Sequence, residues 1–228
     1  AHVGHLRGGL EAVRTIPVRQ TMAGRSGRDF YPGEAWLLKT LWRAYELKGT
    51  PGGRTFFEQG RILSRRHGGE IGELAYLIAS MQEFARPGLF EDIAARAEAL
   101  ARKIAVPGWT AAFLITKAGG LSGTRKFQEA FVALDEAASI YERMGDRGHL
   151  AECLIHRASF RSQTNDLEGT RADYREAIRI LDALDLAEEA VAVRIRAGLT
   201  LQSRPKLALG FLNEGLAGAE ALGSIGLI

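Results

Sequence analysis

Three residues that can bind a metal or activate a nucleophile fall at helical spacing in the second half of the chain. His149, Cys153 and His156 are separated by four and then three residues, so one face of a helix could present all three. Two imidazole nitrogens and a thiolate are ligands that zinc accepts, and a Cys–His pair can also activate a thiol nucleophile. However, no fourth ligand is spaced nearby, and cysteine is often buried as a small apolar residue. The pattern therefore favours packing over a zinc site or a catalytic thiol.

Two other groups of residues lack the arrangement that their chemistry requires. The segment 121–126, Leu-Ser-Gly-Thr-Arg-Lys, superficially resembles a phosphate-binding loop, but it does not match G-x-x-x-x-G-K-[ST] and no strand precedes it. The carboxylate pairs Asp135-Glu136 and Glu188-Glu189 are adjacent in sequence, so the two members of a pair do not face each other on a helix. The sequence thus predicts a protein with no enzymatic activity, no metal and no cofactor.

The amino-acid composition is typical of a globular protein that buries an apolar core away from water. The chain has 228 residues, of which 46% are apolar and 25% are charged, and no apolar run approaches the length of a membrane span. Its single cysteine, Cys153, excludes an internal disulfide and fits a reducing compartment, so a cytoplasmic location without membrane contact is expected. Because the chain starts Ala1-His2 with no apolar signal region, we expect a piece of a larger protein.

Apolar residues recur at i, i+3, i+4 and i+7, and short turns rich in Gly, Pro, Asn and Asp separate the periodic segments. The predicted helices span 34–48, 54–67, 70–85, 88–105, 109–120, 124–144, 148–164, 167–184, 187–202 and 204–223. Links this short make consecutive helices antiparallel neighbours, which predicts five hairpins. We expect an N-terminal extension over 1–33 (a short helix and a basic loop), a helical array over 34–224 and an apolar tail over 225–228.

A repeat of small residues runs through the last three hairpins. The first helices carry Ala118, Ala158 and Ala197, at nearly equal intervals along the chain. The second helices carry small–large–small triplets, which are Ala130-Leu134-Ala137, Thr170-Tyr174-Ala177 and Ala208-Leu212-Gly215. Ala44 with Phe56, Gly60 and Leu63 fits the pattern less closely, and the hairpin that Ala79 opens matches only in character.

This pattern resembles the tetratricopeptide repeat, in which small side chains let the helices of a hairpin approach closely. The stretch Asn165-Asp166-Leu167, followed by Tyr174-Arg175-Glu176-Ala177-Ile178, is most similar to the family's turn and second helix. The period near 40 is longer than the family's usual repeat and resembles the long-helix variety found in bacterial regulators and signalling ATPases. The resemblance implies an all-α fold, a right-handed superhelix of about five helical hairpins.

The same resemblance implies a function. Arrays of this kind act as scaffold or sensor modules that bind a protein or peptide in a groove lined by the first helices of the hairpins. The groove positions, carried over one hairpin at a time, are Tyr45, Lys48, Glu73, Tyr76, Ser80, Glu83, Phe84, Glu152, Ile155, Ser159, Ser162, Gln163, Arg194 and Gln202. We therefore expect this chain to bind a protein or peptide and to form part of a larger cytoplasmic regulatory protein. Self-association through the solenoid ends is a further possibility.

Uneven charge suggests an alternative. Residues 1–68 hold 12 Lys/Arg and 5 Asp/Glu, and the remainder holds 18 and 22, so net charges of +7 and −4 give the total of +3. A basic end can mark a nucleic-acid contact. The basic residues concerned are Arg14, Arg19, Arg25, Arg28, Arg54, Arg61, Arg65 and Arg66. They are spread over several predicted elements and not packed into one tract, so a solvated surface is the favoured interpretation. A nucleic-acid-associated helical module is the second hypothesis for the function.

Overall fold

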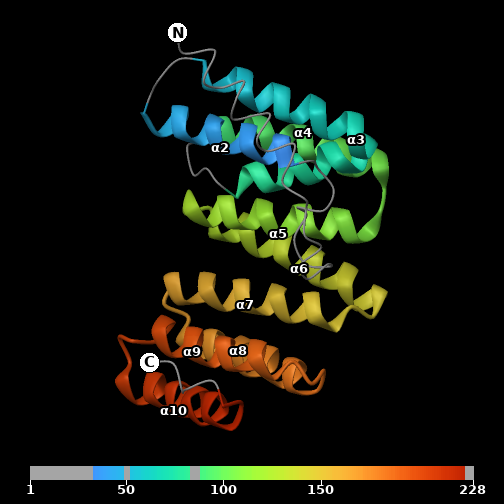
Figure 1. The fold of residues 1–228 in the computed structure, drawn as a ribbon. Coiled ribbons are helices and arrows are strands. Elements are labelled where there is room, and N and C mark those ends of the chain that lie inside the picture. The colour runs from blue at the N-terminus through green and yellow to red at the C-terminus, as the bar shows by residue number, and fades with distance from the viewer. Residues whose placement is uncertain (1–32, 49–51, 83–87, 224–228) are drawn as a thin grey trace. The chain divides into compact units, whose positions relative to one another are not determined.

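The computed structural model describes residues 33–48, 52–82 and 88–223, and these residues form helices and turns without strands (Figure 1). The helices are α2 (Gly33–Lys48), α3 (Gly53–Met81), α4 (Leu89–Ile104), α5 (Pro107–Gly123), α6 (Phe127–Met144), α7 (Arg147–Gln163), α8 (Leu167–Asp182), α9 (Ala187–Thr200) and α10 (Pro205–Ala221). Most of the predicted extension over 1–33 and the predicted tail over 225–228 lie outside the described residues. Within the described part, no helix combines the length and apolar character that crossing a membrane requires.

The chain divides into two compact units, Ala1–Val106 and Pro107–Ile228. In the second unit, α5 packs on α6, α7 on α8, and α9 on α10, while α6 contacts α7 and α8 contacts α9. Each hairpin thus covers the next, as Figure 1 shows for α7 to α10. In the first unit, α2 packs on α3 and α3 on α4. The prediction of an all-α fold made of stacked helical hairpins is confirmed.

Helix α3 contains two predicted helices, which meet at Gly69. This residue has φ 61° and ψ −146°, a conformation outside the helical region that glycine adopts without a steric penalty. The two arms of α3 fold back on each other at Gly69. Contacts between them show this: Arg61 pairs with Glu73, and the rings of Phe57 and Tyr76 lie 5.7 Å apart. A continuous helix would separate such residues by roughly 20–30 Å. The break predicted between 54–67 and 70–85 is therefore present.

The turns that follow α4, α5, α6, α7 and α8 recur at equal intervals along the chain. Positive φ angles between 52° and 70° occur at every twentieth position, at Ala105, Arg125, Gly145, Asn165 and Asp185. After the last four of these, the next N–H donates at 2.9–3.0 Å to a carbonyl five residues back, from Lys126 to Leu121, Asp146 to Tyr141, Asp166 to Arg161 and Leu186 to Leu181. These bonds satisfy helix-end carbonyls in the Schellman arrangement. Two helix-plus-turn units make one hairpin, which accounts for the repeat period near 40.

The next turn departs from this geometry because Pro205 stands where the sixth positive φ would fall. The proline ring fixes φ at a negative value, so the left-handed conformation is closed to it. The turn shortens instead, and the Arg204 N–H donates to the Leu201 carbonyl at 2.8 Å. This explains why Ala208 follows Ala197 by 11 residues, one fewer than the 12 that separate Thr170 from Ala158 in the hairpin before.

The small residues of the repeat lie in the core of the second unit. Ala118, Ala158 and Ala197 are fully buried. In the last hairpin, a Cβ added to Gly198 would lie 2.5 Å from Leu212 Cγ, so the large residue of that triplet fills the space above a glycine. The first unit follows a different register, because Ala44 is exposed and Ala79 is only half-buried.

Candidate functional site

Helix α7 carries the most complete set of predicted groove residues. It is a first helix of its hairpin, and it contacts both α5 and α9, the first helices on either side. Glu152 and Gln163 are exposed on it, whereas Ile155, Ser159 and Ser162 are half-buried. We call this surface the α7 face. It offers a carboxylate, two hydroxyls, an amide and one aliphatic side chain along a single helix.

Internal hydrogen bonds hold the polar side chains of the α7 face in place. The Ser159 hydroxyl donates to the Ile155 carbonyl at 3.1 Å and lies 3.2 Å from the hydroxyl of Tyr174 on α8. Gln163 donates to the Ser159 carbonyl at 3.3 Å, and the same nitrogen lies 3.5 Å from the Ser122 hydroxyl on α5. Side chains that are already ordered lose less conformational entropy when a ligand binds.

His156 also lies on the α7 face, although the family's groove positions do not include it. Its Nε2 is 3.9 Å from the Glu152 carboxylate, and 30% of its side chain is exposed. Desolvation lowers the pKa of His156, the Glu152 carboxylate raises it, and the positive charge of Arg196 on α9 lowers it further; the net shift is downward. His156 is therefore neutral at pH 7 and can both donate and accept a hydrogen bond. Its spacing of four residues from Glu152 is the only sequence signal for this role.

Of the two predicted groove residues on and beyond α9, Arg194 has its partner away from the α7 face. Arg194 pairs with Asp182 in the last turn of α8 at 2.6 Å, and only 18% of its side chain is exposed. Arg194 therefore contacts the second helix of the preceding hairpin. Arg196, two positions along, is the α9 arginine whose positive charge lowers the pKa of His156. Gln202 is exposed beyond the end of α9.

In the first unit, most of the predicted groove residues that the structure describes are buried. Glu73 pairs with Arg61 and Arg65, and Ser80 donates to the Tyr76 carbonyl at 2.8 Å. Glu73, Tyr76 and Ser80 are thus inside the unit and present no open groove surface. Tyr45 is half-buried with its ring edge-on to Phe56, Lys48 is exposed at the end of α2, and Glu83 and Phe84 lie outside the described residues.

The histidines and the cysteine at 149, 153 and 156 are separated by their surroundings. His149 Nδ1 lies 2.7 Å from the Asp146 carboxylate, and its ring stacks on Tyr141 with centroids 4.9 Å apart. Cys153 is buried, and burial raises the pKa of its thiol to about 12. Among the described residues, no group of three or more His, Cys, Asp and Glu side chains is arranged to share a metal ion.

We expect the thiol of Cys153 to be unreactive in the folded protein. At pH 8 a thiol with a pKa of about 12 is almost entirely protonated, and only the thiolate attacks. Labelling by a disulfide reagent should therefore be at least about a hundredfold slower in buffer than in urea. The chain in urea serves as its own control for reagent access. Equal rates in the two conditions would contradict the buried environment.

The basic residues behind the nucleic-acid hypothesis are largely neutralised where the structure describes them. Arg54 pairs with Asp92 at 3.0 Å, and Arg61 pairs with Glu58 at 2.8 Å and with Glu73. Arg65 also pairs with Glu73, while Arg66 is exposed. Arg14, Arg19, Arg25 and Arg28 lie outside the described residues. The described part of the basic region thus presents few charges that are available to phosphate.

Comparison with known proteins adds no family assignment: no protein-family model matches the chain, and no curated protein matches its sequence.

Proposed function

We propose that this chain is a non-catalytic module that binds a protein or peptide along the α7 face. The observation that supports this is the row of polar side chains on α7 that internal hydrogen bonds hold in place. Helix α7 contacts the first helices on both sides, α5 and α9. An extended peptide needs donors and acceptors at intervals along its backbone together with a few apolar contacts. The serines, Gln163 and His156 provide the former, and Ile155 provides an apolar contact.

The proposed module is part of a larger cytoplasmic regulatory protein. A ligand that spans α5, α7 and α9 contacts three hairpins, so it favours the relative hairpin positions that fit it best. Such a ligand shifts the population of hairpin arrangements, and an attached effector domain can respond to that shift. The buried thiol of Cys153 and the neutral His156 serve no catalytic purpose in this proposal.

The test compares partner capture by the whole chain with capture by two matched double variants. Glu152→Arg with Gln163→Arg changes both exposed ends of the α7 face. Glu136→Arg with Gln128→Arg makes the same residue changes at exposed positions of α6. Capture from lysate at low and high salt, with mass spectrometry, should recover a defined protein that the α6 variant retains and the α7 variant loses by about tenfold or more.

Either of two results would contradict the proposal. Equal capture by the two variants would place the partner elsewhere on the chain. Recovery of nucleic acid that dissociates at high salt, without a protein partner, would favour the second hypothesis, since phosphate contacts weaken steeply with salt.

A further inference from the structure

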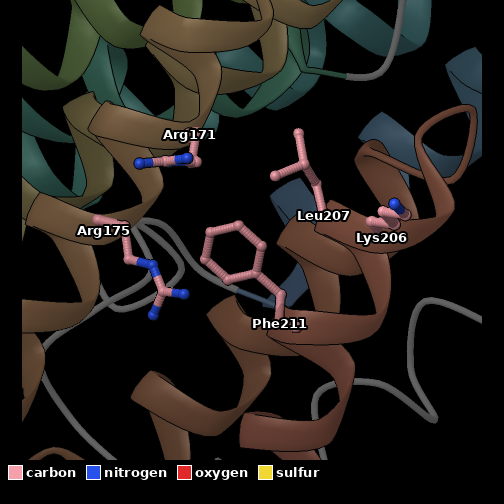
Figure 2. Close-up of a pocket in the computed structure, with 6 residues that line it drawn as sticks. Arg171, Arg175, Lys206, Leu207 and Phe211 are labelled. Atoms are coloured by element: carbon pink, nitrogen blue, oxygen red, sulfur yellow. The ribbon is translucent and has the colours of Figure 1, made fainter.

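A pocket lies between the second helices of the last two hairpins, away from the α7 face. Its volume is about 450 Å³, and it is lined by Arg171, Arg175, Lys206, Leu207, Gly210 and Phe211. Figure 2 shows Arg171 and Arg175 on α8 facing Leu207 and Phe211 on α10 across this space. We call it the α8–α10 pocket. Three of its six lining residues are cationic, and the remaining ones are apolar or lack a side chain.

The three cations are not equivalent. Arg175 forms a two-pronged pair with Glu214 at 2.6 and 2.8 Å, and the hydrogen bond from Arg175 lowers the pKa of Glu214. That arginine is therefore neutralised and held in place. Arg171 and Lys206 are exposed, and among the described residues neither pairs with a carboxylate. The pocket thus keeps two positive charges without an internal counter-ion.

The start of α10 adds to this positive potential. Lys206 and Leu207 belong to its first turn, where Pro205 occupies an initial helical position and no acidic residue is present. The aligned peptide dipoles of a helix place partial positive charge at its N-terminal end, which favours a neighbouring anion. This effect is one of charge and not of free backbone donors, because Pro205 has no N–H and those of Leu207 and Ala208 donate to the Arg204 carbonyl. Two side chains and the helix end therefore act in the same direction.

The apolar lining restricts the kind of anion. Phe211 is buried, and the Arg175 guanidinium lies 4.4 Å from its ring centroid, so this ring offers no open face on which a nucleobase could stack. Leu207 is half-buried, and a Cβ added to Gly210 would meet no atom within 4 Å. This leaves room for an aliphatic side chain next to the cations, a combination that fits an acidic peptide better than a nucleotide.

We propose that the α8–α10 pocket binds an acidic segment of a partner protein in which a carboxylate stands next to an aliphatic residue. Acidic side chains of this segment pair with Arg171 and with Lys206, and the aliphatic side chain packs on Leu207 above Gly210. The pocket lies on second helices and the α7 face on a first helix. The two sites therefore use different residues, and each proposal can fail without the other.

The test titrates the whole chain with a short fluorescein-labelled peptide in which Glu pairs alternate with Leu, followed by fluorescence anisotropy. Arg171→Gln with Lys206→Gln removes the two unpaired charges and should weaken binding by roughly tenfold or more, since two charge-assisted contacts are lost. Lys126→Gln with Arg143→Gln removes the same charge from the turn before α6 and from α6, and it should leave binding unchanged.

Two single substitutions move the affinity in opposite directions. Glu214→Gln releases Arg175 from its pair and should tighten peptide binding several-fold. Gly210→Glu places a competing carboxylate in the pocket and should abolish binding, while glutamate favours the helix more than glycine does. The proposal is overturned by a wild type that does not bind, by equal weakening in the two charge-removal pairs, or by tighter binding of a single-stranded oligonucleotide than of the peptide.

Discussion

Replacing Tyr174 by alanine is expected to lower the free energy of unfolding of the Pro107–Ile228 unit by about 3–5 kcal/mol. Tyr174 is fully buried in the core that α7, α8, α9 and α10 share, and its ring meets Phe211 edge-on at 6.4 Å. Truncation removes this ring from the position where two consecutive hairpins meet. The neighbouring helices can close the space only in part, because each is held on both sides by other contacts.

The variant Tyr174→Phe separates the ring from its hydroxyl. The hydroxyl lies 3.2 Å from Ser159 and 3.0 Å from Thr200, and both of these residues also donate to carbonyls of their own helices. Removing it leaves neither partner without a hydrogen bond, so we expect a loss of only about 1 kcal/mol. Urea unfolding followed by circular dichroism gives both values. Similar losses for Phe and Ala would show that packing of the ring is not the main contribution.

The second large effect is expected at Asp173, whose replacement by alanine should cost about 2–4 kcal/mol. Its buried carboxylate accepts two hydrogen bonds from Arg157, at 2.9 and 3.1 Å, and one ion pair from Arg161 at 3.1 Å. Arg157 also reaches Asp135 on α6 at 2.9 Å, so this cluster joins three helices. Without Asp173, two largely buried arginine side chains face each other with too little negative charge between them.

Glu176→Ala on the same helix is the matched control. Glu176 pairs with Arg179 at an exposed position, so its removal should change stability only slightly. Hydrogen exchange should show faster opening of α6, α7 and α8 in Asp173→Ala, while α2 and α3 keep wild-type protection, because each repeat contacts only its neighbours. Uniform loss of protection over both units, or equal effects of the two substitutions, would contradict this account.

Local sequence predicted the helices and turns of the second unit closely. The predicted segments 148–164 and 167–184 correspond to α7 and α8, which end within two residues of the predicted limits. Such agreement follows from strong local chemistry. Asp146 and Asp166 accept hydrogen bonds from the N–H groups of His149 and Gly169, which are the capping bonds that start these helices. Tight turns of this kind need few contacts from the rest of the fold.

The groove residues were predicted less well because the register of a hairpin depends on its neighbours. In the first unit, alignment of Ala79 with the small residue of the repeat predicted Tyr76 and Ser80 as groove residues. Instead, Tyr76 packs on Phe57. A Cβ added to Gly60 would collide with the Tyr76 hydroxyl. Gly60, and not Ala79, is therefore the small residue at that close contact. A repeat pattern this degenerate permits several registers, and only the packing of large side chains selects one.

The amino-acid sequence by itself determined the all-α class, the positions of most turns and the period near 40, because capping, glycine and hydrophobic spacing act over a few residues. Tertiary structure alone decided which polar groups lie on the surface and which are buried. Arg175 on α8 pairs with Glu214 on α10, and Arg171 on α8 lines the same pocket as Lys206 on α10. Both depend on how α8 and α10 pack. Such pairings have no local signature, since charge and size at one helix position do not specify the helix that will face it.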